Sequence, residues 1–386
     1  MTTHEQRRSA QAAARQPIGM IALGFGRRYP GGAEHQAEVL SRELARRGRR
    51  ILIYAPLPST DTRPVAPAPP SMRVIPVPAL GFSRTRTATF LPMLALMQLV
   101  PGFEHPRILH SHMAWYHAVL PQVLALVKGV RTLVKFACSG PDGEIATMSR
   151  TFAGRQALRI IGSADRLIAL TSAVADELRF AGFDEGRIRV IPNGVSLPRP
   201  TPPAVDLERL RAPRVLLAGR LTNQKGVSEF LSAWANASTA DDATLLVAGT
   251  GPLQESLQAR AAEADLAGRV CLLGHRPDIG ALFAAAQLVV IPSRSEGMSN
   301  VALEALAAGT PVIGFDIPGI REVVDDRRML VKPGDHKRLA EVVVQSLRSA
   351  DLLADAAGRG RQRVLRSFAI EEVATRYEEV YHELGG

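Results

Sequence analysis

Two glutamates mark the densest group of residues that could carry chemistry. Glu296 lies in a loop after the predicted strand 288–291, and Glu304 follows with seven residues between them. A helix predicted to begin at Ser299 or Asn300 places Glu304 about one turn deeper than Glu296. Carboxylates accept hydrogen bonds from hydroxyls, so the pair suits two ends of an extended ligand that carries sugar or ribose diols. The alternative, two solvated acids, fits Glu304 poorly because its neighbours are apolar.

The start of this helix and a second loop favour a phosphate ligand. A helix N-terminus offers N–H donors and a partial positive charge, and the small residues before it allow close approach. Arg220 and Lys225 follow the predicted strand 215–218, at the end where ligands of parallel sheets bind. Two such cations would neutralise a diphosphate. A basic loop alone could simply be solvated; next to an anion-binding helix, it favours a diphosphate site.

A glycine-rich loop joins the predicted strand 18–24 to the first helix. Gly24 and Gly26 begin a dinucleotide-binding fingerprint, but Tyr29 stands where its third glycine is required. A nicotinamide enzyme is therefore disfavoured. Gly31 and Gly32, at the helix start, still allow the backbone to approach a phosphate or a sugar.

Further polar residues follow two other predicted strands of the first half. His110 and His112 are two residues apart and so face the same side of a strand. They form either a buried core pair or part of a cleft, and a metal site would need a third ligand that the local sequence lacks. The loop after the next strand offers Ser139, Gly140 and Glu144 as acceptor or sugar contacts.

Several common catalytic motifs are absent from the sequence. There is no Asp-x-Asp pair, no Walker loop and no Gly-x-Ser-x-Gly elbow. We therefore expect no metal-bridged diphosphate, no metal site and no cofactor.

Parallel sheets must position these loops. Apolar strands alternate with helical segments, and continuously apolar strands are typical of a parallel sheet covered on both faces. The pattern stops in a proline-rich segment and then restarts, which predicts two doubly wound α/β domains with a ligand cleft between them. The predicted parts are a disordered tail (1–16), a first domain (17–196), a hinge (197–213), a second domain (214–367) and a final helical segment (368–386).

Composition limits the function classes. The 386 residues carry 47 Lys and Arg against 37 Asp and Glu, a net charge of +10, and only two cysteines, which excludes a disulfide scaffold and a cysteine-rich metal site. The basic excess leaves nucleic acid, anionic lipid and phosphorylated ligands open. Many arginines lie on predicted helices, where a solvated basic face is the simple alternative; examples are Arg42, Arg46, Arg47, Arg49 and Arg50.

Neither a signal peptide nor a membrane-spanning helix is predicted. The longest apolar stretch, residues 90–100, is interrupted by Pro92 and is too short to span a bilayer. Arg84 and Arg86 precede it, so residues 82–100 are either a segment on an anionic membrane surface or a core helix.

Taken together, these motifs resemble the retaining glycosyltransferases of family 4, which have the GT-B fold. The resemblance covers about residues 17–384, and its most specific part is the pair Glu296 and Glu304. It implies two Rossmann-like domains that face each other across a cleft, the first on the acceptor side and the second on the donor side, with residues 368–386 crossing back to the first.

The resemblance also implies a role for each site residue. Arg220, Lys225 and Glu296 would be catalytic, the two cations holding a diphosphate and Glu296 the transferred sugar, while Glu304 would hold the ribose. Acceptor or sugar contacts would come from His112, Ser139, Gly140 and Glu144. Further donor contacts would come from Gly31, Gly32, His275, Arg276, Gly297, Met298, Ser299, Asn300 and Val301.

The implied activity is metal-independent transfer from a nucleotide-sugar, with a UDP-sugar favoured, to a hydroxyl of a glycan, a lipid-linked acceptor or a small molecule. The partners would be that donor and acceptor, with a peripheral contact to the inner face of the membrane as a further option, no nucleic acid, and a cytoplasmic location. The alternatives are an epimerase or phosphorylase of the same fold and a non-catalytic basic binding protein, which the set of Arg220, Lys225, Glu296 and Glu304 disfavours.

Overall fold

A computed structural model describes residues 16–25, 31–56, 67–79, 84–97, 104–197, 210–237 and 243–385, with side chains omitted for 84–88. The chain forms two compact units, Met1–Gly194 with Ile370–Gly386 (unit 1) and Val195–Ala369 (unit 2). The two points where the chain passes between units lie side by side, because Val195 N donates to Phe368 O at 2.8 Å. Residues 1–15 of the predicted tail, 198–209 of the predicted hinge and 26–30 of the glycine-rich loop lie outside the described residues.

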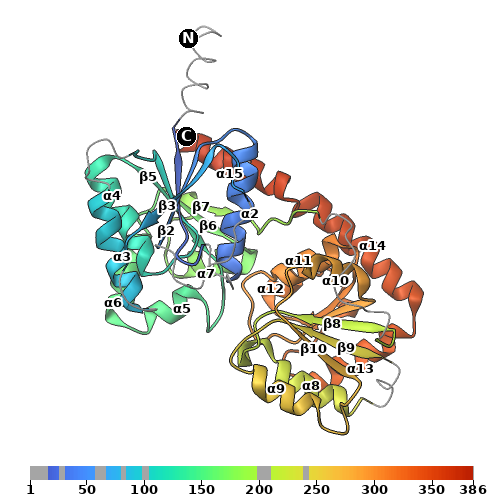
Figure 1. Ribbon diagram of the computed structural model, residues 1–386. Helices are drawn as coiled ribbons and strands as arrows, with labels where there is room; N and C mark the ends of the chain where they lie inside the picture. Colours follow the sequence, from blue (N-terminus) through green and yellow to red (C-terminus); the bar gives the residue numbers. More distant parts are fainter. Residues whose placement is uncertain are drawn as a thin grey trace. The chain divides into compact units, whose positions relative to one another are not determined.

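Unit 1 contains a seven-stranded parallel sheet in the order β3-β2-β1-β4-β5-β6-β7 (Figure 1). The strands are β1 (Ile18–Ile21), β2 (Ile51–Pro56), β3 (Met72–Val77), β4 (Ile108–Ser111), β5 (Arg131–Phe136), β6 (Arg166–Ala169) and β7 (Ile188–Val190). The helices are α2 (Gly32–Arg46), α3 (Arg84–Met97), α4 (Val119–Lys128), α5 (Glu144–Ser149), α6 (Phe152–Ile161), α7 (Ser172–Phe180) and α15 (Ile370–Glu383), with 3-10 turns η1 (Tyr116–Ala118) and η2 (Glu185–Arg187).

Unit 2 contains a six-stranded parallel sheet in the order β10-β9-β8-β11-β12-β13. The strands are β8 (Arg214–Ala218), β9 (Thr244–Ala248), β10 (Val270–Gly274), β11 (Leu288–Ile291), β12 (Val312–Phe315) and β13 (Leu330–Val331). The helices are α8 (Val227–Ala235), α9 (Gln254–Ala261), α10 (Ile279–Ala285), α11 (Asn300–Ala307), α12 (Pro318–Arg321), α13 (His336–Leu347) and α14 (Ala350–Ser367), with turns η3 (Asn223–Lys225) and η5 (Arg327–Met329). The predicted doubly wound α/β architecture is confirmed.

Side chains that alternate in direction along the strands of unit 1 divide its core between the two faces of the sheet. Ile18 and Met20 of β1 pack with α2 and α15, whereas Ile21 packs with α3 and α4. Successive side chains of a strand point to opposite faces, so each face needs its own helical cover. The helices α2 and α15 cover one face, and α3, α4, α6 and α7 cover the other.

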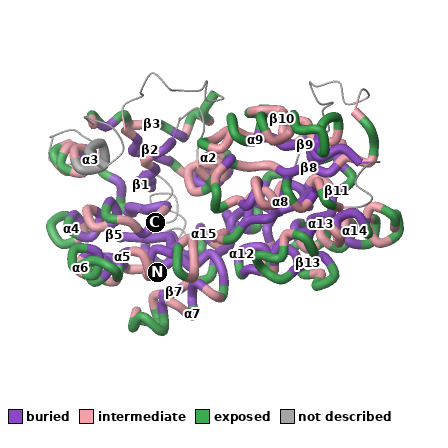
Figure 2. Tube along the Cα trace, turned by 90° about the horizontal axis from the view of Figure 1, so that it is seen from below, coloured by how far each residue is buried: buried purple, intermediate pink, exposed green. Residues whose placement is uncertain are grey.

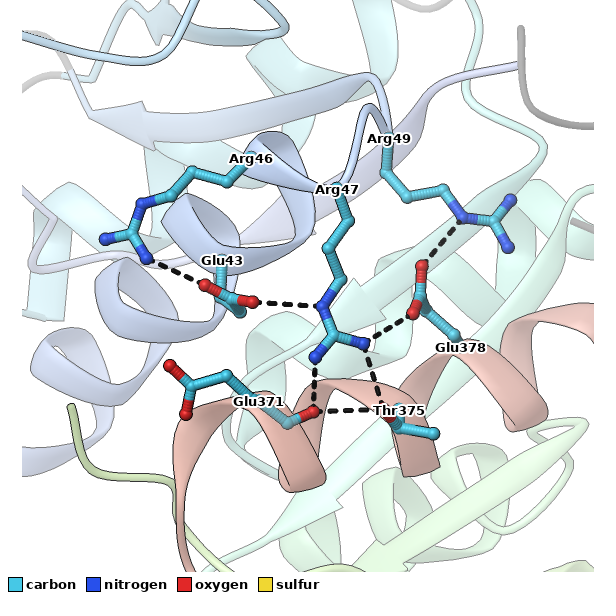
Figure 3. Close-up of polar contacts among 7 residues, drawn as sticks. All are labelled: Glu43, Arg46, Arg47, Arg49, Glu371, Thr375 and Glu378. Atoms are coloured by element: carbon cyan, nitrogen blue, oxygen red, sulfur yellow. Dashed lines mark hydrogen bonds and ion pairs between the residues drawn. The ribbon is translucent and has the colours of Figure 1, made fainter. Parts of the chain in front are cut away.

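The C-terminal helix α15 completes unit 1, where it packs beside α2 (Figure 1). Its buried residues recur at helical spacing, including Ile370, Val373, Tyr377 and Tyr381, as expected for a helix with one apolar face. A polar cluster at the end of α2 fixes it further (Figure 3): the Arg47 guanidinium donates to Glu378 Oε2 at 2.9 Å and to the Glu371 carbonyl.

This cluster shows that Arg47 and Arg49 are not part of a merely solvated basic face, the simple alternative for these arginines. Arg47 is only 25% exposed and also pairs with Glu43 at 3.0 Å, while Arg49 pairs with Glu378 at 3.4 Å. Their shared partner Glu378 lies more than 300 residues away along the chain, so only tertiary contact shows that these cations hold α15.

Residues 82–100 form α3 where they are described. Phe90 and Leu94 are fully buried between α3 and the sheet, so the core-helix alternative holds for them. Residues 82, 83 and 98–100 and the side chains of Arg84 and Arg86 lie outside the described part. Among the described residues, no helix is long and apolar enough to cross a bilayer.

Candidate active site

The order of strands in unit 2 indicates a candidate ligand site between β8 and β11. From β8 the chain adds β9 and β10 on one side of β8, and it then returns to add β11, β12 and β13 on the other side. The connections therefore leave in opposite directions between β8 and β11. Crevices of this kind, at the carboxyl ends of the strands, are where open α/β sheets bind ligands. The two loops singled out in the sequence, residues 219–226 and 292–299, follow these two strands.

An ion pair joins the two loops. Lys225 Nζ lies 2.5 Å from Glu296 Oε1, and the two side chains are only 19% and 11% exposed. Backbone contacts support the pair: Arg294 N donates to Gln224 O at 2.9 Å, and Gln224 Nε2 donates to Ser295 O at 3.1 Å. The structure therefore brings two sequence-predicted site residues, 71 positions apart, into direct contact.

Glycine is required where these loops are packed most closely. Gly226 has a φ of +63°, and a Cβ there would lie 2.2 Å from the carbonyl oxygen of Pro292. Gly319 in α12 lies under the other loop, where a Cβ would stand 2.4 Å from the carbonyl oxygens of Glu296 and Gly297. These contacts fix the backbone that carries Lys225 and Glu296.

The helix α11 begins at the same edge of the sheet. Ser299 is its N-cap, with Oγ accepting from Ala302 N at 3.3 Å, which confirms the predicted cap, and Ser299 N donates to Gly319 O. The first turn contains no acidic residue, so the partial positive charge of the N-terminus is not neutralised within that turn. Asn300 and Val301 occupy the first turn, and Glu304 follows in the second, partly buried.

The remaining donor-side residues are less enclosed. Arg220 is exposed in the loop after β8, and His275 is exposed after β10. The Arg276 guanidinium pairs with Asp278 through contacts of 2.9 and 2.7 Å. Gly297 and Met298 directly follow Glu296 in the sequence. Gly297 is partly buried, and Met298 is buried. Among the described residues, no group of three or more His, Cys, Asp or Glu side chains could hold a metal.

Comparisons with known proteins identify the family. Residues 30–199 match the family described as Glycosyltransferase Family 4, and residues 212–349 match Glycosyl transferases group 1. The D-inositol 3-phosphate glycosyltransferase of Xylanimonas cellulosilytica is 30% identical in an alignment of 394 positions that covers 91% of each chain. The chain belongs to glycosyltransferase family 4. This glycosyltransferase is also 29% identical to the 2-deoxystreptamine N-acetyl-D-glucosaminyltransferase of Streptomyces fradiae, over 83% of each chain.

Solved structures show that the fold of this glycosyltransferase is GT-B. Sucrose-phosphate synthase from Thermosynechococcus elongatus superposes with a TM-score of 0.78 at 22% identity, covering 96% of this chain and 99% of that one. An Anabaena protein, HepE, solved with UDP-glucose, gives a TM-score of 0.75 at 19% identity, covering 96% and 100%.

The predicted acceptor-side residues of the glycosyltransferase lie in unit 1. Glu144 is 2% exposed, and its two carboxylate oxygens accept from the backbone N–H groups of Ala137 and Cys138, each at 2.9 Å. Burial raises the pKa of this carboxyl. Glu144 therefore shapes the loop that carries Ser139 and Gly140, both of which are partly buried.

His112 belongs to a buried polar cluster under α15. Its ring stacks on His110 with a centroid separation of 4.2 Å, and His110 Nδ1 lies 2.8 Å from Tyr381 Oη. Burial lowers the pKa of both histidines well below the ordinary value, so both are neutral. Lys135 is buried nearby, donates to Asn193 Oδ1 at 2.9 Å and has its pKa lowered by burial to about 7.

Sequence reasoning missed three residues at these sites. Gly319 was not singled out because only the tertiary fold brings it under the Glu296 loop. Asn193 was not singled out, because only the fold brings it to the Lys135 ammonium. Glu34 lies against the backbone of Gly24 and Gly31, where a Cβ at either glycine would stand 2.5 Å from its carboxylate. Its position three residues after the N-cap Gly31, where capping-box acids occur, could have indicated it.

Proposed function

We propose that this glycosyltransferase transfers a sugar from a UDP-sugar to a hydroxyl acceptor, with retention of the anomeric configuration. The observation that carries the proposal is the Lys225–Glu296 ion pair next to the N-terminus of α11. A cation, a carboxylate and a helix N-terminus at one crevice match the diphosphate, the hydroxyls and the overall negative charge of such a donor.

The spacing of the two glutamates suits the two ends of the donor. Asn300 begins α11 and Glu304 lies four residues further, which is roughly 6 Å along the helix axis. Glu296 precedes the helix on the other side of its N-terminus. We infer that the diphosphate occupies the N-terminus, with the transferred sugar at Glu296 and the ribose at Glu304.

The chemistry follows from where charge develops. The bond between the sugar and the diphosphate breaks, and negative charge accumulates on the leaving oxygen. Lys225, Arg220 and the first-turn amides of α11 stabilise that charge, since fixed donors that need no reorganisation contribute strongly to lowering a barrier. The acceptor hydroxyl attacks from the face that the diphosphate leaves, and the leaving phosphate oxygen takes its proton. The structures solved with UDP and UDP-glucose share only the fold with this chain, and they are the reason to test uridine nucleotides first.

A thermal-shift experiment tests the donor class. We expect UDP and a UDP-sugar to stabilise the protein, with about 2.7 kcal/mol gained when the ligand is at 100 times its Kd. GDP and GDP-mannose should shift the midpoint less. Glu304→Ala should lose most of the shift while its midpoint without nucleotide stays within about 2 °C, as expected for a partly buried helix residue outside the core. Glu379→Ala, on an exposed position of α15, is the matched control and should keep the full shift.

Product analysis tests the transfer itself. We expect UDP release to require a hydroxyl acceptor, such as a cyclitol or a sugar, and the product to keep the donor's anomeric configuration by NMR. An inverted product would refute retention. Sugar products formed from the donor without any acceptor would assign the protein to epimerases or phosphorylases of the same fold. No stabilisation by any nucleotide would refute the donor site.

A further inference from the structure

A buried glutamine holds the point at which the chain leaves unit 1. Gln36 lies on α2 and is only 4% exposed. Its amide pairs with both peptide groups of a residue 158 positions away: Gln36 Nε2 donates to Gly194 O at 2.9 Å, and Gly194 N donates to Gln36 Oε1 at 3.0 Å. Gly194 ends the first segment of unit 1, and Val195 begins unit 2. The pairing therefore fixes the backbone immediately before the chain passes to unit 2.

The returning chain lies against the same residue. A Cβ at Gly194 would stand 2.6 Å from Ile370 Cδ1 and 3.2 Å from Ile370 Cα, so the outgoing backbone packs directly on the first residue of α15. On the unit 2 side, Val195 N donates to Phe368 O at 2.8 Å. We call these two paired segments the crossing: residues 193–195 and 368–370.

Further contacts hold both segments of the crossing in unit 1. Lys135 Nζ, on β5, donates to Asn193 Oδ1 at 2.9 Å, and both side chains are buried. The return segment continues into α15, which packs beside α2 and is held there by the Arg47 cluster. Both helices carry buried residues along their length (Figure 2). Unit 1 therefore holds the chain up to Gly194 and again from Ile370.

The elements that hold the crossing also carry the predicted ligand loops of unit 1. Helix α2 begins directly after the glycine-rich loop, and Gln36 lies about one turn after Gly32, a predicted donor contact. Strand β5, which contains Lys135, is followed by the loop with Ser139 and Gly140, which are predicted acceptor or sugar contacts. The position of the crossing is thus set by the same helix and strand that position these loops.

A glutamine at this place contributes direction more than it contributes stability. The next residues of α2 on its buried side, Ala37 and Leu40, are apolar and belong to the core. Burying a polar amide is costly unless every group finds a partner, whereas a fully paired amide specifies one arrangement of the groups it contacts. The planar donor and acceptor of Gln36 match one orientation of the Gly194 peptide groups.

We propose that Gln36 is a positioning residue for sugar transfer, which sets the direction in which the chain leaves unit 1 and thereby the arrangement of the two units in which transfer occurs. The inference rests on the proposed function, in which the diphosphate binds unit 2 and the predicted acceptor contacts belong to unit 1. Gln36 acts through Gly194 and touches neither substrate. Since a misplacement of about 1 Å can cost about 10²-fold in rate, a loosened crossing should slow transfer without weakening UDP binding to unit 2.

Two glutamines with the same burial make the test specific. Gln36→Met keeps the length of the side chain and removes both hydrogen bonds to Gly194. The matched control is Gln122→Met, on α4 and on the opposite face of the sheet. Gln122 is 3% exposed, donates to Ala118 O at 3.4 Å and accepts from Thr132 Oγ1 at 2.8 Å. Each variant loses one buried amide, and only Gln36→Met changes the crossing.

Three measurements on the full chain separate positioning from stability and from donor binding. With UDP-glucose as donor and myo-inositol as acceptor probe, Gln36→Met should lower the rate of UDP release at least about tenfold, and Gln122→Met should change it less than about twofold. The Kd of UDP, measured by calorimetry, should stay the same in both variants. Small-angle X-ray scattering, which needs no substrate, should show a broader distribution of interatomic distances for Gln36→Met and an unchanged one for Gln122→Met.

Three results would overturn the proposal. The first is scattering and UDP release in Gln36→Met that match the unchanged protein. The second is an equal loss of UDP release in Gln122→Met, which would assign the effect to stability. The third is a rise in the Kd of UDP as large as the loss of rate, which would assign Gln36 to donor binding through α2.

A second pair of variants keeps the test decisive if Gln36→Met does not fold. Gln36→Ala leaves room for water to pair with the Gly194 peptide groups, so the fold is retained while the connection to α2 is lost, and Gln122→Ala is its control. Failure of the proposed function would look different. The unchanged protein would then bind no UDP, whereas the scattering of the same variants would still decide whether Gln36 sets the crossing.

Discussion

Replacing Lys225 with glutamine tests whether this cation acts on the donor or only on Glu296. In the structure Lys225 Nζ lies 2.5 Å from Glu296 Oε1, and both side chains are largely shielded from solvent. The substitution removes one positive charge and leaves the carboxylate of Glu296 uncompensated beside the expected diphosphate.

The expected loss can be worked from two effects. Removing one fixed donor to a developing negative charge costs about 2.7–4 kcal/mol of barrier, which is a factor of 10²–10³ in rate. Two negative charges about 4 Å apart repel by up to about 4 kcal/mol at an effective dielectric constant of 20. We therefore expect kcat/KM of Lys225→Gln to fall at least 10²-fold, with a thermal midpoint close to that of the unchanged protein.

A double-mutant cycle with Glu296→Gln separates the two effects. If Lys225 contacts the diphosphate, Lys225→Gln should still lower kcat/KM about 30-fold or more when Glu296 is already glutamine. It should also weaken UDP binding, measured by calorimetry, while leaving uridine binding unchanged, because uridine has no phosphate. Arg366→Gln, an exposed arginine of α14, is the control for loss of a charge and should match the unchanged protein.

One outcome would refute this reasoning. If Lys225→Gln changes kcat/KM by less than threefold in the Glu296→Gln background, Lys225 only neutralises Glu296, and the diphosphate must bind elsewhere.

Two further predictions concern stability. Gly226→Ala should lower the free energy of unfolding by at least about 2 kcal/mol in urea titrations, from the left-handed backbone and the 2.2 Å approach to the Pro292 carbonyl. Gly358→Ala, in open space on α14, should be neutral or slightly stabilising. An equal loss of stability in Gly226→Ala and Gly358→Ala would refute the steric argument. Acidification should also destabilise unit 1. Three buried histidines have their pKa lowered by burial, to about 4 for one of them, so below pH 6.5 the unfolded state binds more protons; they are His110, His112 and His117. The contribution of each histidine to stability is nearly full above pH 6.5 and should fall by about 1 kcal/mol between pH 6.5 and 5.5. His117→Gln should reduce this pH dependence by about a third, whereas the exposed His382→Gln should not; an unchanged dependence in His117→Gln would contradict the assignment.

Several structural features were accessible from the sequence because they depend on local physics. The strands predicted at 215–218 and 288–291 form β8 and β11, since buried parallel strands are continuously apolar. The cap at Ser299 followed from its hydroxyl before a helical pattern. The roles of the individual site residues remain predictions, which the variants above test.

Other features could not be read from local patterns. The sequence placed Glu144 in a polar loop, whereas in the structure it begins α5. Its buried carboxylate accepts hydrogen bonds from the backbone N–H groups of residues six and seven positions earlier. From the sequence, Arg47 was one of many arginines near predicted helices, whereas the structure also pairs it with Glu378 on α15. The exposure of Leu126 and Val127 on α4 was not anticipated, because a helical pattern does not reveal which of its apolar residues the fold leaves uncovered.

By itself, the sequence determined the periodicity, the caps and the chemical types of the loops, hence the α/β class and the prediction that the cations and glutamates form a donor site. These depend on neighbours within one or two turns, where spacing and propensity decide. Only the tertiary structure decided which distant groups meet: Lys225 with Glu296, Gly319 with the Glu296 loop, and α15 with α2. Such contacts depend on strand order and packing, because a sheet brings together the ends of strands that the chain itself keeps far apart.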